Sequence, residues 1–141
     1  MSTNFINRVV NLINTERAQA DLDPLRVDSQ LSQAARLHTR SMANNDFVSH
    51  YGIDGSSPFK RIRDTGYRYS AAGENIAAGY RTPAAVVDAW MGSAGHRASI
   101  LNPNFTEIGV GHKYLANDTG SVNYNSYWTT TFGNPIETDF D

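Results

Sequence analysis

The chain has 141 residues, a formal net charge of -2, an apolar share of 40% and no cysteine. This length and composition fit one globular domain with a substantial core. The charge balance offers no basic field for nucleic acid or an anionic membrane, and the lack of cysteine excludes disulfides, thiolate metal sites and cysteine nucleophiles.

Two helices are predicted in the first third of the chain. Apolar residues at steps of three and four predict an amphipathic helix over residues 4–21. It should end before Pro24, because proline disfavours helical backbone in the residue that precedes it. A second helix is expected over residues 29–45, with Asp28 or Ser29 as its cap.

The middle of the chain carries two further helix starts. A polar loop from His50 to Ser57 is followed by Ser57-Pro58, which predicts a short helix ending near Gly66. Thr82-Pro83 starts another helix, with threonine as cap and proline in the first position. Apolar residues of this last helix are expected to face the core: Val86, Val87 and Trp90.

The C-terminal third changes from helical to strand periodicity. Alternating residues over 108–115 and a segment rich in aromatic and β-branched residues over 124–132 predict an antiparallel hairpin. A third strand is expected near residues 73–79, with helices on the faces of the sheet. Gly109 and Gly111 would allow a helix to approach the sheet closely.

Ten short motifs occur in an order that resembles a known family. They are Asn14-x-x-Arg17, the His38 to Met42 segment, Phe47-x-Ser49-His50, Gly55-x-Ser57-Pro58-Phe59, Gly73-Glu74-Asn75-Ile76-Ala77, Trp90, Gly95-His96-Arg97, Ile100-Leu101-Asn102-Pro103, Ile108-Gly109-Val110-Gly111 and Tyr127-Trp128-Thr129. From about Ile6 to Gly133 the chain resembles the CAP superfamily (cysteine-rich secretory proteins, antigen 5, pathogenesis-related 1), in particular its cysteine-free bacterial branch.

The resemblance implies an α+β fold, an α-β-α sandwich with a small antiparallel sheet between helical layers. It implies a single CAP domain over residues 1–135, followed by an acidic C-terminal tail over residues 136–141. No stretch is apolar enough to span a bilayer, and residues 1–15 lack the layout of a signal peptide. The resemblance places such domains outside the cell or in the cell envelope, so an export signal would lie outside this chain.

The resemblance also implies a central cleft lined by two histidines and two acidic residues. Position by position, His50 matches the first histidine, Glu74 the first acid and His96 the second histidine. Ser93 stands where the second acid is usual, so the chain keeps three residues of four. A remote acid, Asp88 or Glu107, could replace the missing one.

The three matched residues allow two interpretations. In one, Glu74 orients His50 and His96 in a hydrogen-bonded polar cluster, supported by Asn75 and Ser93. In the other, two imidazoles and a carboxylate bind a metal with water in the fourth position. The candidate cofactor is therefore zinc or another divalent cation at His50 and His96.

The remaining candidates have simpler interpretations. Ser93 and His96 lie three residues apart, but the chain has no Gly-x-Ser-x-Gly elbow there, so a serine hydrolase lacks its usual parts. His38 lies on the apolar stripe of its helix and is expected to be a core residue. His112 alternates with core residues and is interpreted as structural.

We therefore expect a non-enzymatic extracytoplasmic binding module whose His/Glu cleft holds a divalent metal or a small polar ligand, with lipid binding on a nearby apolar surface. One alternative is a metal-assisted, peptidase-like hydrolase acting on peptide or envelope polymer. Another is a structural adhesion domain of a larger secreted protein. The expected partner is a small molecule, a lipid or an envelope polymer, and not nucleic acid.

Overall fold

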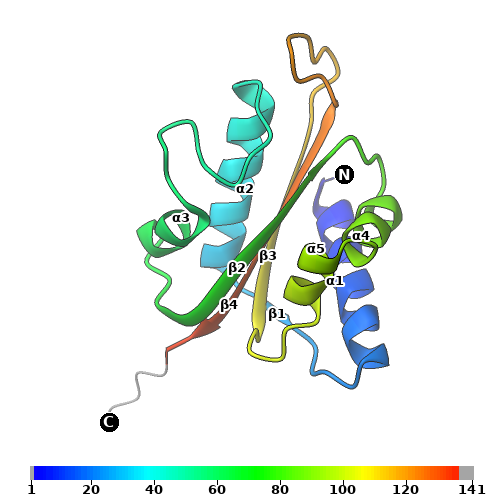
Figure 1. Cartoon of the computed structure of the whole chain (residues 1–141), viewed down its shortest axis with the longest axis vertical. Coiled ribbons are helices and arrows are strands. Elements are labelled where there is room, and N and C mark those ends of the chain that lie inside the picture. Colours follow the sequence, from blue (N-terminus) through cyan, green and yellow to red (C-terminus); the bar gives the residue numbers. More distant parts are fainter. Residues whose placement is uncertain (1, 137–141) are drawn as a thin grey trace.

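The computed structural model describes residues 2–136, which form a three-layer α-β-α sandwich (Figure 1). The elements in chain order are α1 (Ser2–Gln19), β1 (Arg26–Val27), α2 (Ser29–Asn44), α3 (Pro58–Asp64), β2 (Tyr69–Ala78), α4 (Pro83–Met91), α5 (Ala94–Ile100), β3 (Glu107–Tyr114) and β4 (Ser126–Pro135). Helices α2 and α3 cover one face of the sheet, and α1, α4 and α5 cover the other. The sandwich predicted from the sequence is confirmed. Of the expected acidic tail over residues 136–141, all but Ile136 lies outside the described residues.

The sheet has the strand order β1-β3-β4-β2. The predicted hairpin of β3 and β4 is antiparallel, and β2 pairs antiparallel with β4 on its other side. The sheet is not wholly antiparallel, because β1 pairs parallel with β3 through Arg26 and Val27. A strand of two residues shows no alternation, so periodicity could not reveal it. Strand β2 also begins at Tyr69, four residues before the predicted start.

Polar caps fix where three of the helices begin. The carboxylate of Asp28 accepts hydrogen bonds from the backbone N–H groups of Gln30 and Leu31, both at 2.9 Å, so Asp28 rather than Ser29 caps α2. Ser57 and Thr82 cap α3 and α4 in the same way. Helix α5 was not predicted. Its seven residues are too few to show a helical period.

Two glycines of β3 bring α2 close to the sheet, as the sequence predicts. A Cβ atom on Gly109 would lie 2.2 Å from the backbone carbon of Leu31. On Gly111 it would lie 2.6 Å from the carbonyl oxygen of Ala35. Any side chain at either position would therefore push α2 off the sheet.

The apolar core lies on both faces of the sheet. The larger cluster packs α1, α4 and α5 against the sheet and includes Trp90, which is buried as expected, and Trp128. Each indole N–H has a backbone acceptor, Ile76 for Trp90 and Tyr80 for Trp128. Two smaller clusters fill the other face around Leu31 and Met42. The sheet is thus a rigid support between two cores.

One buried cation, Arg17, joins α1 to the chain between α5 and β3. Its side chain is 1% exposed. The guanidinium donates hydrogen bonds to four carbonyl oxygens, those of Asp23, Ile100, Asn102 and Phe105, at 2.8 to 3.2 Å. These bonds hold the end of α5, and with it His96, in a fixed position relative to α1.

Candidate functional site

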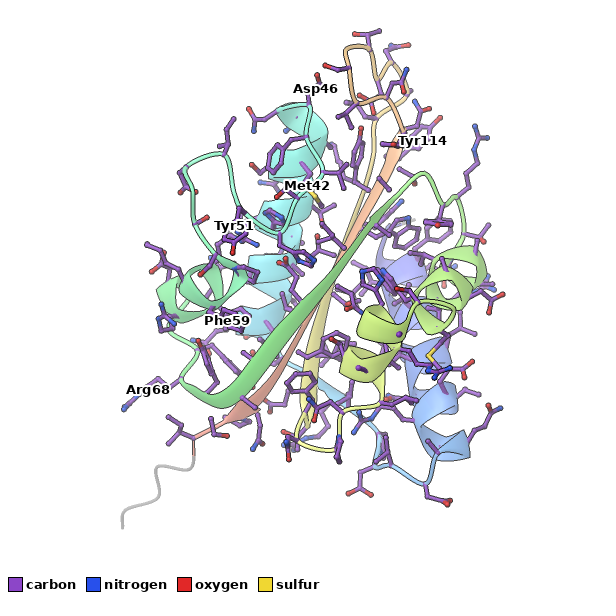
Figure 2. All side chains as sticks on the ribbon, in the orientation of Figure 1. Met42, Asp46, Tyr51, Phe59, Arg68 and Tyr114 are labelled. Atoms are coloured by element: carbon purple, nitrogen blue, oxygen red, sulfur yellow. The ribbon has the colours of Figure 1, made fainter. Side chains whose placement is uncertain are left out.

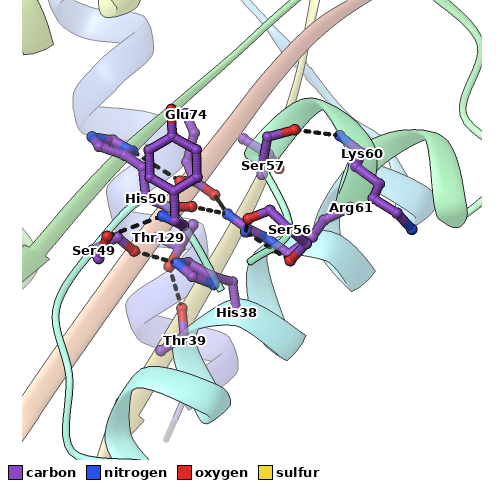
Figure 3. A network of polar contacts seen from close by, with 12 residues as sticks. His38, Thr39, Ser49, His50, Ser56, Ser57, Lys60, Arg61, Glu74 and Thr129 are labelled. Carbon is purple, nitrogen blue, oxygen red and sulfur yellow. Dashed lines mark hydrogen bonds and ion pairs between the residues drawn. The ribbon is translucent and has the colours of Figure 1, made fainter. Parts of the chain in front are cut away.

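Glu74 is the buried centre of the candidate site. It lies on β2, opposite Thr131 of β4, and its side chain is only 2% exposed. One carboxylate oxygen lies 2.9 Å from Nδ1 of His50, and the other accepts a 2.9 Å bond from Nη2 of Arg61 (Figure 3). A buried carboxylate needs such partners, because desolvation of an unpaired charge is costly.

Arg61 of α3 was missed in the sequence. Besides Glu74, its guanidinium binds the carbonyl oxygens of His50 at 2.7 Å and Ser56 at 2.8 Å. It therefore holds both the carboxylate and the two ends of the loop that carries His50. The only signal in the sequence was a basic residue in the last turn of a short helix, which is usually a favourable interaction with the helix end.

His38 of α2 holds the start of the loop that carries His50. As predicted, it is a core residue, 1% exposed, and its Nε2 lies 2.7 Å from the carbonyl oxygen of Ser49. Burial lowers the pKa of His38 below its usual value. A neutral ring with the proton on Nε2 satisfies this geometry, so Ser49 is fixed immediately before His50.

His50 is oriented so that one ring nitrogen remains available. Its Nδ1 bonds to Glu74, while the side chain is 43% exposed. The ring lines a pocket of about 280 Å³ together with Glu74, Tyr51, Pro58 and Phe59. Nε2 is therefore the nitrogen with which His50 can bind a ligand.

His96 is held in a similar way from the other helical layer. Its Nδ1 lies 3.1 Å from the hydroxyl of Ser93, the N-cap residue of α5. Burial, and then the nearby charge of His50, lower the pKa of His96, so the ring is neutral at pH 7. The two histidines thus lie within electrostatic reach of each other across the edge of β2, and Nε2 of each remains available.

Asn75 supports the second histidine through the backbone. Asn75 lies in β2 and is 1% exposed. Its amide donates a 3.1 Å hydrogen bond to the carbonyl oxygen of His96, which ties α5 to the sheet.

The structure separates the carboxylate from the serine–histidine pair. Glu74 bonds to His50 and not to His96, so Ser93, His96 and Glu74 do not form the chain of contacts that a catalytic triad needs. The two remote acids do not complete the cluster either. Glu107 accepts a hydrogen bond from Tyr67 and pairs with Arg26, and Asp88 is exposed on α4.

His112 has a structural environment, as interpreted from the sequence. Its Nε2 lies 2.9 Å from the hydroxyl of Ser126, and its ring packs against both Phe5 and Trp128. Burial lowers its pKa. It takes no part in the arrangement around Glu74.

The side chains of this site that could bind a metal ion are the imidazoles of His50 and His96; His50 lines the pocket beside Glu74, and His96 does not. Both oxygens of Glu74 are already bonded, and within residues 2–136 no three His, Cys, Asp or Glu side chains are grouped closely enough to hold a metal ion. A cation at this site would therefore use Nε2 of His50 and Nε2 of His96, with water or a ligand in the other positions.

Comparison with known proteins agrees with this architecture. The family model described as the cysteine-rich secretory protein family, CAP, matches residues 10–132. The chain is 44% identical over 128 residues to YkwD of Bacillus subtilis, covering 91% of this chain and 46% of that protein. It is 32% identical to YlbC of the same organism, described as a membrane protein, over 79% of this chain and 32% of YlbC. The chain spans less than half the length of either relative.

Solved structures share the fold. An extracellular protein of Bacillus anthracis that contains an SCP domain superposes with a TM-score of 0.81 and 27% identity, over 94% of this chain and 41% of that one. An outer surface protein of Borrelia burgdorferi gives a TM-score of 0.81 at 21% identity, over 91% and 90% of the two chains. Among residues 2–136, no helix has the length and apolar character needed to cross a membrane.

Proposed function

The chain belongs to the cysteine-rich secretory protein (CAP) family, and from this premise we propose that it is an extracytoplasmic binding module whose His50 and His96 hold a divalent cation or a small polar ligand. The observation that carries the proposal is the buried carboxylate of Glu74 on Nδ1 of His50. A carboxylate on the far nitrogen of an imidazole fixes its tautomer and makes the free nitrogen a better ligand.

The chemistry of the two rings supports a cation as the ligand. Zinc and copper bind neutral imidazole, and the lowered pKa of His96 keeps this ring neutral at physiological pH. A bound cation would supply Lewis acidity and an anchor for an anionic or polar ligand group. The residues of this chain contribute orientation: Glu74 fixes one ring and Ser93 the other.

The surface beside His50 supports an apolar part of the ligand. Tyr51, Ile53 and Phe59 are 63%, 69% and 44% exposed, and Tyr51 and Phe59 line the same pocket as His50. Figure 2 labels Tyr51 on the loop between α2 and α3, and Phe59 at α3. Large apolar side chains exposed beside a polar centre are typical of sites that accept a lipid or another amphipathic molecule.

The location outside the cytoplasm is proposed from the relatives. The Bacillus anthracis protein is described as extracellular, and the Borrelia burgdorferi protein as an outer surface protein. A module that binds a ligand through one open site fits both settings.

Zinc titration by isothermal calorimetry tests the proposal. We expect saturable binding of one zinc ion per chain to metal-free protein at pH 7.5. Binding should weaken at least about tenfold in His50→Ala and in His96→Ala, because each removes one of two protein ligands. The matched control is His112→Gln, which removes an imidazole outside the pair and should leave the affinity unchanged.

Two results would overturn the proposal. One is that the parent protein binds neither zinc nor copper saturably, and that no small polar molecule in a ligand screen shifts the NMR signals of the His50 and His96 rings. The other is binding that persists in the double variant of both histidines. Circular dichroism of each variant shows whether a loss reflects the ligands or the fold.

A further inference from the structure

A second pocket lies at the end of the sheet where β2 begins and β4 ends. It has a volume of about 570 Å³ and is lined by Arg63, Gly66, Tyr67, Arg68, Tyr69 and Ile136. Ile136 continues β4, since its N–H bonds to the carbonyl oxygen of Arg68 at 3.0 Å. The pocket shares no lining residue with the His50 pocket. Its volume is in the range of small-molecule sites.

The floor of this pocket is aromatic and rigid. Tyr67 is 3% exposed, and its ring packs over Gly133, where a Cβ atom would lie 2.6 Å from the ring. The hydroxyl donates a 2.7 Å hydrogen bond to Glu107, whose other oxygen pairs with Arg26. Burial raises the pKa of Tyr67, so the phenol stays neutral at physiological pH. Glu107, the carboxylate that Tyr67 contacts, is therefore already paired with a donor and a cation.

The rim of the pocket is positively charged. Arg63 of α3 and Arg68 before β2 are both exposed, and within residues 2–136 no carboxylate pairs with either. Arg63 is positioned by a 2.9 Å bond from Nη1 to the hydroxyl of Tyr69. Figure 2 shows Arg68 projecting at this end of the molecule. Two guanidinium groups over an aromatic floor form a local charge opposite in sign to the net charge of -2.

We propose that this pocket binds a phosphate monoester whose phosphate lies between Arg63 and Arg68 and whose apolar or ring-shaped body covers Tyr67 and Tyr69. A phosphate monoester carries a charge of about -2 at neutral pH, which matches two arginines. The planar guanidinium binds phosphate oxygens in pairs, whereas a single carboxylate would leave one arginine unmatched. A free metabolite and a phosphomonoester lipid headgroup share this chemistry.

Titration followed by NMR of the backbone amides tests the site, with phenyl phosphate as the probe. We expect saturable shifts at residues 63–69 and at Ile136, and weaker binding of inorganic phosphate, which lacks the ring. Arg63→Gln and Arg68→Gln should each weaken phenyl phosphate by about fivefold, the effect of one charge-assisted bond at a partly exposed site. Tyr69→Phe should weaken the binding of phenyl phosphate less, because this change removes only the hydrogen bond that positions Arg63.

Two controls separate this site from other effects. Arg81→Gln removes an exposed arginine that does not line this pocket, and His50→Ala removes a histidine of the proposed cation site. Neither change should alter the affinity for phenyl phosphate. Vesicles of phosphatidylcholine with phosphatidic acid distinguish the sources of the ester: retention of the parent chain, but not of Arg68→Gln, identifies the lipid. Binding of phenyl phosphate without retention on these vesicles identifies the free ester.

Three results would overturn the proposal. They are no saturable binding of phenyl phosphate or of the vesicles, equal losses in Arg81→Gln and Arg68→Gln, and equal affinities for inorganic and phenyl phosphate. One further result, involving the acidic residues 137, 139 and 141, would also overturn it. If the probe binds only after these are changed to amides, the occupant is the chain's own end and not an external ester.

Discussion

Oε1 of Glu74 lies 2.9 Å from Nδ1 of His50, and the two side chains differ greatly in solvent exposure. The Glu74 side chain is 2% exposed and that of His50 is 43% exposed. A buried acid thus fixes a ring that reaches solvent, with Arg61 compensating the buried charge from the other side. The base of the site is therefore fixed, while the ring that it orients reaches solvent.

The base of the site should contribute strongly to stability. Glu74→Gln removes the charge that pairs with Arg61, whose side chain is 14% exposed, and leaves a buried cation without its counter-ion. We expect the free energy of unfolding to fall by about 3 kcal/mol. Urea denaturation at pH 7.5 measures it.

The control for this prediction is Asp64→Asn. Asp64 pairs with Lys60, but both side chains are more than half exposed, so the loss should stay below about 0.5 kcal/mol. In the double variant with Arg61→Met, part of the Glu74→Gln loss should be recovered. Equal losses at positions 74 and 64 would show that the buried pair has no special role.

Arg17 should contribute as strongly to stability in the layer formed by α1, α4 and α5. Arg17→Met removes the donors to four carbonyl oxygens, and we expect a loss of about 3 kcal/mol or more. Arg8→Met, on the exposed face of the same helix, should change stability by less than about 0.5 kcal/mol. Thermal and urea unfolding of the two variants measure the difference, and a mild Arg17 variant would contradict the account.

The close approach of α2 to the sheet predicts a severe effect of a single methyl group. Gly109→Ala places Cβ 2.2 Å from backbone atoms of Leu31, and we expect a loss of about 3 kcal/mol or failure to fold. The matched control is Gly95→Ala in α5, where nothing lies within 4 Å. Because alanine favours helix over glycine, it should stabilise by about 0.5 kcal/mol. Unfolding curves that coincide would disprove the tight contact.

The buried histidines predict how stability depends on pH. Burial lowers the pKa of His38, so the unfolded chain takes up this proton more readily than the folded one. The stability from the neutral ring is fully present above about pH 6.5 and is lost as pH falls through the lower folded pKa, at up to about 1.4 kcal/mol per pH unit for each group.

Urea unfolding from pH 8 to pH 5 measures this loss. In His38→Gln, whose amide can still donate to the carbonyl oxygen of Ser49, the slope should be smaller. His96 and His112, whose pKa values are also lowered by burial, account for the slope that remains. An identical slope in the parent and the variant would show that His38 titrates alike in both states.

Local chemistry explains which parts of the fold the sequence reveals. Asp28, Ser57 and Thr82 cap their helices through side-chain bonds to nearby backbone, so the sequence predicts these starts to within a residue or two. Strand β1 and helix α5 escape prediction because two and seven residues show no period, and both depend on contacts with distant chain.

The candidate site shows the same limit. The family resemblance selects His50, Glu74 and His96, but not which histidine the acid orients, since that depends on how the loop before α3 folds over β2. The sequence does not reveal Arg61 for the same reason. Its guanidinium contacts Glu74, thirteen positions away, and a backbone carbonyl oxygen of the loop, and neither contact leaves a local pattern. Non-local pairing of this kind has no signature in spacing.

The most direct test of the account is long-range proton–nitrogen NMR of the histidine rings, recorded with and without zinc. We predict that zinc moves the Nε2 signals of His50 and His96 to the range of a metal-bound nitrogen, while Nδ1 of His50 stays protonated and bonded to Glu74. The signals of His38 and His112 should not move. Zinc that shifts only one of the two rings, or shifts His38 or His112 instead, would contradict the account.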